Sequence, residues 1–214
     1  MSHAKFHPIT QQVYNSVASS LENLKTSDVE EDQYIDCLVM HSPFPNPEQT
    51  LEAWSALESF VPHKIRSLGI SNVTLQELQN LTNHKSVQVQ PSVIQNRFRA
   101  QERQWDLGVR KWCKNRGGTT KYQGFWTLTG NRHEYHSQGF VKELAEAAGI
   151  SKETAWYSLI LAMNIVILNG TTSEKHMRED LDAIGKVARW RGTDEGREVW
   201  ERCFQGFKDL VGEV

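Results

Sequence analysis

A histidine stands where an apolar run of the sequence stops. Residues 34–43 read YIDCLVMHSP, and the mostly apolar run from Ile35 to Met40 ends on His41. An imidazole changes its charge near neutral pH, so it can orient or protonate a substrate oxygen. A histidine that only bonds a neighbouring loop would look the same, because histidine is commonly half-buried. His41 is therefore a candidate catalytic residue whose role depends on its neighbours.

Other polar or aromatic side chains follow further apolar runs. They are Lys5 in AKF, Ser71 and Asn72 in GISNV, Gln95 and Asn96 in VIQN, Phe125–Thr127, and Asn169–Thr171. In parallel α/β folds the reacting groups gather at the carboxyl ends of strands. If each apolar run is a strand, these side chains lie at the same end of a sheet as His41. Plainer explanations remain, since Ser71 and Asn72 could cap the next helix and Phe125 and Trp126 could fill the core.

The apolar runs alternate with helical patterns. The expected strands are at 34–40, 64–71, 91–98, 120–128 and 164–170, with a short first strand at 4–6. The expected helices are at 11–24, 47–61, 74–82, 104–118, 140–149, 151–163, 173–188 and 193–211. Apolar residues recur in them every three or four positions, and Thr74 is a candidate N-cap.

Alternation of buried strands with helices predicts an α/β fold with a parallel sheet. Six strands are two fewer than a closed (β/α)₈ barrel needs, and such barrels usually have about 250 residues. A doubly wound sheet would fit the number, but no glycine-rich phosphate-binding turn follows any strand. No repeat or linker interrupts the sequence, so residues 1–214 are expected to form a single domain.

Composition narrows the classes of function. The 214 residues carry a net charge of −2, which gives no basic field for nucleic acid or anionic membranes. No apolar run approaches the roughly 20 residues of a membrane span, and the N-terminus has no secretory pattern. The odd number of isolated cysteines, Cys37, Cys113 and Cys203, suits a reducing compartment, so a cytoplasmic location is expected.

One segment has the spacing of a metal-binding pair. HEYH at 133–136 contains a His-x-x-His spacing, which brings two imidazoles together on a helix. We expect this segment to be a loop without a third ligand nearby. No metal site is therefore predicted.

Several long strings, in sequence order, resemble the aldo-keto reductases, most closely the fungal type. They are LVMHSPFP, TLEAWSALESFV, IRSLGISNVTLQELQNL, PSVIQNRF, KYQGFWTLTGN and LNGTTSEKHMREDL, spread between about residue 4 and residue 186. The resemblance implies an incomplete (β/α)₈ TIM-type barrel of about six parallel strands, ending in the helix at 193–211. It also implies NAD(P)H-dependent reduction of a small carbonyl compound, without a metal.

The resemblance implies roles for the residues at the strand ends. His41 would orient the substrate carbonyl, and Lys5 would tune the acid. Ser71, Asn72 and Gln95 would hold the carboxamide of the nicotinamide.

Later segments would hold the rest of the cofactor. The resemblance implies that the nicotinamide stacks on Phe125, with Trp126 as the alternative. Leu128 would follow in the loop that passes the pyrophosphate.

The adenosine end is implied to lie on the segment TTSEKHMRED. Thr171 and Ser173 would donate to the phosphates, aided by a helix N-terminus. Glu179 and Asp180 would contact adenine. The resemblance favours NADP(H). NAD(H) stays open, because no basic residue for the adenosine 2′-phosphate is evident among the nearby cations.

The sequence departs from the family in one important respect. The family's catalytic Tyr and Asp lie on the second β/α unit, and no matching stretch is found, so the chain is expected to start at about the third strand. His41 or Lys5 could substitute as the acid. The alternatives are a non-redox enzyme (cyclase, isomerase or dehydratase) that uses these two residues as acid and base, or a non-catalytic binding subunit. Open strand edges also predict a homodimer or an N-terminal plug.

Overall fold

The computed structural model describes residues 8–26 and 33–213, which divide into two compact units. The first unit holds the described residues up to Gln95, together with Gly108–Lys121. The second holds Asn96–Leu107 and the described residues from Tyr122 onward. The expected strand at 4–6 lies outside the described residues, and the expected single domain stays a prediction.

Three parallel strands form the centre of the first unit. β1 (Leu38–Met40) pairs with β2 (Leu68–Ser71), and β2 pairs with the start of β3 (Val93–Arg97). Every residue of β2 is buried, as expected for a strand covered on both faces. A side chain at Gly69 would come within 2.8 Å of the Val93 carbonyl, so only glycine allows this close strand approach.

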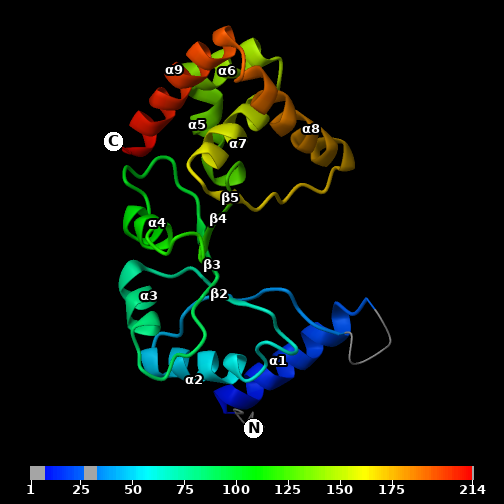
Figure 1. The fold of residues 1–214 in the computed structure, drawn as a ribbon, viewed down its shortest axis with the longest axis vertical. Coiled ribbons are helices and arrows are strands. Elements are labelled where there is room, and N and C mark those ends of the chain that lie inside the picture. Colours follow the sequence, from blue (N-terminus) through cyan, green and yellow to red (C-terminus); the bar gives the residue numbers. More distant parts are fainter. Residues whose placement is uncertain (1–7, 27–32, 214) are drawn as a thin grey trace, which may run out of the picture. The chain divides into compact units, whose positions relative to one another are not determined.

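Helices cover these strands. They are α1 (Ile9–Asn23), α2 (Pro47–Glu58), α3 (Leu75–Thr82) and α4 (Leu107–Lys114). Figure 1 shows α1 running alongside α2, where the rings of Tyr14 and Phe60 meet edge to face at 5.4 Å. The α2 side chain Trp54 is fully buried and donates its indole N–H to the Val89 carbonyl at 3.0 Å.

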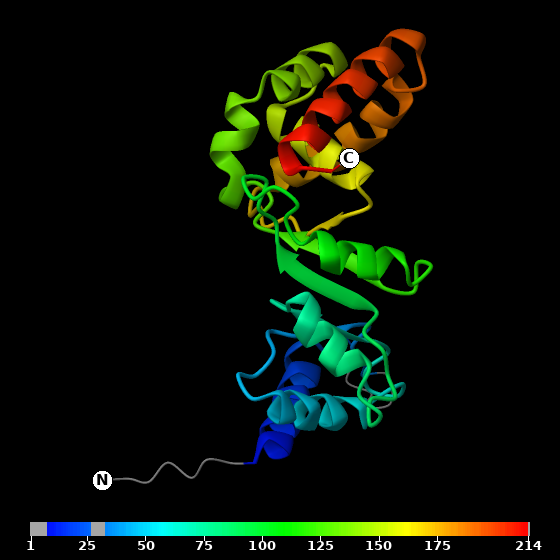
Figure 2. The same ribbon diagram turned by 90° about the vertical axis from the view of Figure 1, so that its left-hand side faces the viewer.

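The second unit pairs β4 (Lys121–Phe125) in parallel with β5 (Val166–Ile167). Its helices are the 3₁₀ turn η2 (Thr129–Asn131), α5 (Arg132–Ser137), α6 (Gly139–Ala148), α7 (Lys152–Ala162), α8 (Glu174–Trp190) and α9 (Asp194–Val211). Figure 2 shows the other long helices of this unit gathered around α7. Buried aromatic rings join them, since Trp156 of α7 meets both Phe207 of α9 and Phe98 edge to face.

Most predicted elements are confirmed, and two interpretations are wrong. The segment 34–40 is not a buried strand throughout, because β1 is only Leu38–Met40 and its residues are half-buried. HEYH is not a loop, because residues 132–137 form α5, where Tyr135 is buried against Trp156. In both cases the pattern of a short segment does not determine its secondary structure, and packing against the rest of the unit does.

Two further observations concern the described part of the chain as a whole. Cys37, Cys113 and Cys203 are free thiols. None of the described helices has the length and apolar character needed to cross a bilayer.

The N-terminus of α3 carries a reciprocal cap, of which the sequence predicted the N-cap residue, Thr74. The Thr74 hydroxyl accepts from the Glu77 N–H at 3.3 Å, and the Glu77 carboxylate accepts from the Thr74 N–H at 2.8 Å. The cap satisfies backbone donors that a helix start leaves without partners. It also anchors α3 directly after the loop that contains Ser71 and Asn72.

Replacing Thr74 by alanine should therefore destabilise the chain. Thr74→Ala removes the hydroxyl acceptor and should cost about 1 kcal/mol of unfolding free energy, with faster hydrogen exchange of the first α3 amides. Thr74→Ser keeps the acceptor and is the matched control. Equal urea denaturation midpoints for the two variants would contradict the capping interpretation.

Candidate functional site

Four of the predicted site residues meet at the carboxyl ends of β1, β2 and β3. The Ser71 hydroxyl donates to the Gln95 carbonyl at 2.7 Å, and the Asn72 backbone N–H donates to the same oxygen at 3.1 Å. The Asn72 side-chain amide donates to the carbonyl of His41 at 2.8 Å. Asn72, the first residue after β2, thus links the ends of β1 and β3. These strand ends lie side by side in the first unit, and the site roles of the four residues stay a prediction.

Backbone conformation explains why an asparagine occupies this junction. Asn72 has φ of +53°, in the left-handed region that asparagine tolerates better than most side chains. The conformation turns the chain sharply away from β2 while the amide spans to β1. His41 is exposed at the same end, and the bond from Asn72 reaches its backbone carbonyl, not its ring. Lys5, its predicted partner, lies outside the described residues.

The second unit contains a cavity of about 840 Å³ beside α7 and α8. Four residues predicted to bind cofactor line it: Leu128, Thr171, Glu179 and Asp180. A volume of this size falls in the range of small-molecule and cofactor pockets. The cavity thus gathers residues that the sequence separates by up to 52 positions, 128 to 180.

Asp180 is the most constrained acid of the cavity. Its carboxylate accepts from the Asn169 amide at 2.7 Å and from the Thr154 hydroxyl at 3.4 Å. Burial raises the pKa of this carboxyl above its usual range, although the bonds from Asn169 and Thr154 oppose the rise. Asn169 also orders the next turn, since its side-chain oxygen accepts from the Thr171 N–H at 2.9 Å.

Tyr157 lines the same cavity from α7, and sequence reasoning missed it. Burial and the negative charge of Asp180 raise the pKa of its phenol to about 12. The hydroxyl therefore stays protonated at physiological pH, and it can donate a hydrogen bond to a ligand oxygen. Its segment, AWYSLIL, has the pattern of a core helix buried on all sides. Such a pattern does not indicate that the tyrosine hydroxyl lines a cavity.

Ser173 begins α8 as its N-cap. Its hydroxyl accepts from the His176 N–H at 3.4 Å, and its own N–H donates to the Thr171 hydroxyl at 3.2 Å. The predicted role of Ser173 as a phosphate donor stays a prediction. What the structure adds is a helix start next to the cavity, where backbone N–H groups and the helix dipole favour an anion.

The aromatic pair after β4 has an unusual conformation. Trp126 has φ of +55° and is 56% exposed, although it is one of the largest apolar side chains. Phe125 meets it edge to face at 5.7 Å. The guanidinium of Arg97 lies 4.8 Å from the Trp126 ring, and its buried Nε has no hydrogen-bond partner among the described residues. Which of the two rings would stack on a nicotinamide stays open.

A single buried amide holds the loop that carries these aromatics. The Asn131 side chain is fully buried and donates to the carbonyls of Phe98, Trp126 and Thr127 at 3.1 to 3.2 Å. Its oxygen accepts from the Ala100 N–H at 2.8 Å. Sequence reasoning missed this residue, because TGN reads as an ordinary polar turn. A strained turn needs such support, since each left-handed non-glycine residue costs about 1 to 3 kcal/mol.

Within the described residues, no group of three His, Cys, Asp or Glu side chains is placed to hold a metal ion. His133 and His136, the pair singled out by its spacing, lie on α5. The His136 ring stacks on Tyr135 at 4.3 Å.

Comparisons with known proteins agree on one family. The family model described as "Aldo/keto reductase family" matches residues 2–189. An NADPH-dependent alpha-keto amide reductase of Saccharomyces cerevisiae is 29% identical over 154 residues, which are 68% of this chain and 48% of that protein. An uncharacterized oxidoreductase of the same yeast is 30% identical over 86 residues, 40% of this chain and 30% of that protein. The chain thus spans at most about half the length of these curated relatives.

Solved structures of the same family share the fold. An aldo-keto reductase from a deep-sea metagenome library has a TM-score of 0.74 at 16% identity, covering 96% of this chain and 68% of that one. A thermostable aldo-keto reductase crystallised with the inhibitor epalrestat has a TM-score of 0.71 at 20% identity, covering 95% and 68%. The α/β fold class of TIM-barrel type predicted from the sequence is confirmed.

The buried carboxyl of Asp180 should make stability depend on pH. Its raised pKa means that the folded chain holds the proton more tightly than the unfolded chain. Its contribution is complete below the unfolded pKa of about 4 and is lost as pH rises through the folded value. Asp180→Asn does not ionise, so its stability relative to wild type should increase between about pH 4 and 7. Urea denaturation across this range measures the difference.

Asp209→Asn, at an exposed position of α9, is the matched control. If Asp180→Asn changed the unfolding free energy by the same amount at all pH values, or lowered it at neutral pH, desolvation of the carboxylate would not be the dominant effect.

Proposed function

We propose, from the premise that this chain belongs to the aldo/keto reductase family, that it binds a nicotinamide dinucleotide and reduces a carbonyl compound. The observation that supports this most directly is the cavity beside α7 and α8. Its lining includes four residues to which the family resemblance gives a cofactor role. They are Leu128 on one segment and Thr171, Glu179 and Asp180 on another. A cavity lined by unrelated residues would have removed the basis for the assignment.

The residues present fit the parts of such a cofactor. Leu128 lines the cavity on the loop proposed to pass the pyrophosphate, and Thr171 with the start of α8 offers donors to phosphate oxygens. Glu179 and Asp180 offer acceptors to the amino group of adenine. The Tyr157 hydroxyl adds a donor that does not ionise at physiological pH.

The strand-end group of the first unit carries polar groups of the kind that bind a carboxamide. Ser71, Asn72 and Gln95 carry the hydroxyl and amides that a carboxamide would bind. Phe125 or Trp126 would supply the aromatic face for the nicotinamide ring. These assignments rest on the family motifs, and the network that joins Ser71 and Asn72 to Gln95 supports them.

NADP(H) is the preferred cofactor. Lys186, Arg189 and His176 line the cavity and could attract the additional phosphate, and the yeast relative is named as NADPH-dependent. Glu153 and Asp182 line the same cavity and oppose a further negative charge. Direct comparison of NADPH with NADH decides between the two.

Carbonyl reduction requires a hydride at carbon and a proton at oxygen, which together convert the carbonyl to an alcohol. The reduced cofactor, when bound, supplies the hydride. His41 is the group at the β1 end that we propose to orient the carbonyl and to donate the proton. General acid catalysis of this kind is worth about 10²- to 10⁴-fold in rate. Lys5 is proposed as the residue that tunes this acid.

Titration with NADPH should quench tryptophan fluorescence in a saturable manner. Leu128→Glu places a carboxylate in the cavity and should weaken NADPH binding at least tenfold, because it repels the phosphates. Leu181→Glu makes the same change at a position of α8 that is 73% exposed, and should leave binding within about twofold. No saturable change with either NADPH or NADH would overturn the proposed function.

Replacing His41 should separate binding from chemistry. His41→Ala should lower carbonyl turnover at least a hundredfold and leave the Kd for NADPH unchanged, because the imidazole acts on the substrate oxygen. His63→Ala, at another exposed histidine, is the control. Binding without turnover of any carbonyl by wild type would instead indicate a non-catalytic subunit. Turnover of a substrate without any nicotinamide cofactor would indicate a repurposed non-redox enzyme.

A further inference from the structure

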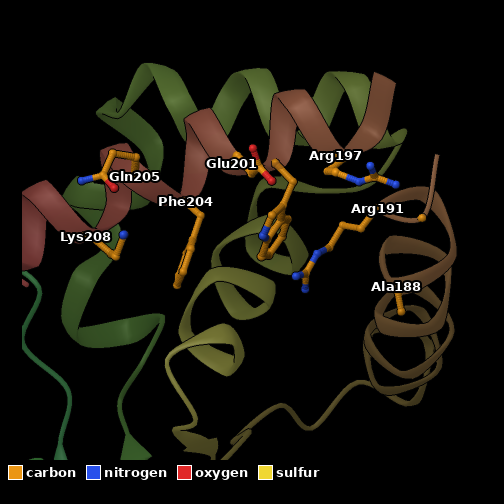
Figure 3. Close-up of a pocket in the computed structure, with 9 residues that line it drawn as sticks. Ala188, Arg191, Arg197, Glu201, Phe204, Gln205 and Lys208 are labelled. Atoms are coloured by element: carbon orange, nitrogen blue, oxygen red, sulfur yellow. The ribbon is translucent and has the colours of Figure 1, made fainter. Parts of the chain in front are cut away.

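The C-terminal part of α8 and one side of α9 enclose a second hollow, drawn in Figure 3. Its volume is about 640 Å³. Trp200, Phe204 and Lys208 line it from successive turns of α9, and Arg191 lines it from the end of α8. Its lining shares no residue with the cavity proposed for the cofactor. We call this hollow the α8–α9 groove.

Four side chains of the groove form a continuous stack. The Arg191 guanidinium lies 3.9 Å from the Trp200 ring centroid, and the Trp200 and Phe204 rings stack at 5.8 Å with an angle of 21° between their planes. The Lys208 ammonium lies 5.6 Å from the Phe204 ring. A cation thus lies over each end of an aromatic pair. Figure 3 shows Phe204 and Lys208 on α9 and Arg191 just beyond the end of α8.

The positive charge of this stack is not balanced locally. Arg191 and Lys208 form no ion pair with a carboxylate among the described residues. Arg197, which also lines the groove, forms one exposed ion pair, with Asp194 at 3.8 Å. Glu201 is the single acid among the described residues that line the groove. Three cations against one acid give the groove a charge of +2 in a chain whose net charge is −2.

Packing accounts for only part of this arrangement. Trp200 is 4% exposed and lies on the buried face of α9 together with Cys203, Phe207 and Val211, which faces α6 and α7. Phe204 is only half-buried, Arg191 is exposed, and both line the groove with Lys208. Cations gathered over aromatic rings beside an open volume are what an anion with a flat apolar body can use, because its charge meets the cations and its body covers the rings.

We propose that the α8–α9 groove binds a small aromatic anion, of the carboxylate class. The carboxylate would pair with Arg191, Arg197 or Lys208, and the ring system would lie against Phe204, which is half-buried. The volume suits a ligand of one or two fused rings. The proposal concerns a site separate from the cofactor cavity and does not depend on carbonyl reduction.

The test uses naphthalene-2-carboxylate as the probe and the full chain. Calorimetric titration should show saturable binding that weakens at high salt, and neutral 2-naphthol should bind at least tenfold more weakly. Arg191→Gln and Lys208→Gln should each weaken the carboxylate at least fivefold. Arg202→Gln, on the same helix but outside the lining of the groove, is the matched control and should bind as wild type does. Saturating NADP⁺ should leave the probe affinity unchanged.

Several results would overturn the proposal. Probe affinity within twofold of wild type in both Arg191→Gln and Lys208→Gln would place the probe elsewhere. Equal binding of 2-naphthol would show that charge plays no part, and absence of binding at millimolar probe would remove the site. Displacement by NADP⁺ would assign the probe to the cofactor cavity. Because NADPH binding is measured separately, failure here leaves the proposed function untouched.

Discussion

Parallel strands leave backbone groups without partners at their carboxyl ends, and side-chain amides satisfy them in both units of this protein. In the first unit, Asn72 bonds the ends of the strands on either side of its own, and in the second, Asn131 binds three carbonyls and one N–H. An unpaired buried backbone group costs about 1 to 3 kcal/mol, so the contacts of the fully buried Asn131 are a condition of the fold, whereas the bond from Asn72 to His41 is exposed. Both sets of contacts fix the loops from which every proposed ligand contact at the strand ends must come.

The same contacts explain why strained residues are tolerated where chemistry is proposed. Asn72 and Trp126 both have positive φ, and each lies beside one of the two amide networks. At Trp126 the hydrogen bond from the buried Asn131 side chain offsets part of the conformational cost, and at Asn72 the residue type itself tolerates the left-handed region. An exposed tryptophan in a left-handed conformation would otherwise relax toward an ordinary turn. The strain therefore indicates that the position of the ring, and not its burial, is what the surrounding structure maintains.

Local signals in the sequence predicted most of the secondary structure, because they depend on neighbouring residues alone. The cap at Thr74 and the five strands in the described residues are examples, and so is the apolar face of α9. Interpretations failed where contacts distant in sequence decide, as in α5, which buries Tyr135 against α7. Asn131 and Tyr157 were missed for the same reason. An asparagine in a polar turn and a tyrosine in an apolar helix acquire their roles only from the elements that fold against them.

Helix α9 illustrates how one helix can serve two physical purposes. Trp200, Cys203 and Phe207 lie on the buried face of α9, and Phe204 and Lys208 lie beside that face at the edge of the groove. Packing on the core accounts for Trp200, which is 4% exposed, whereas the half-buried Phe204 leaves apolar surface in contact with water. Arg191 and Lys208 lie over these two rings with charges that lack a counterion among the described residues. Folding alone does not account for that surplus charge, whereas binding of an anion would neutralise it.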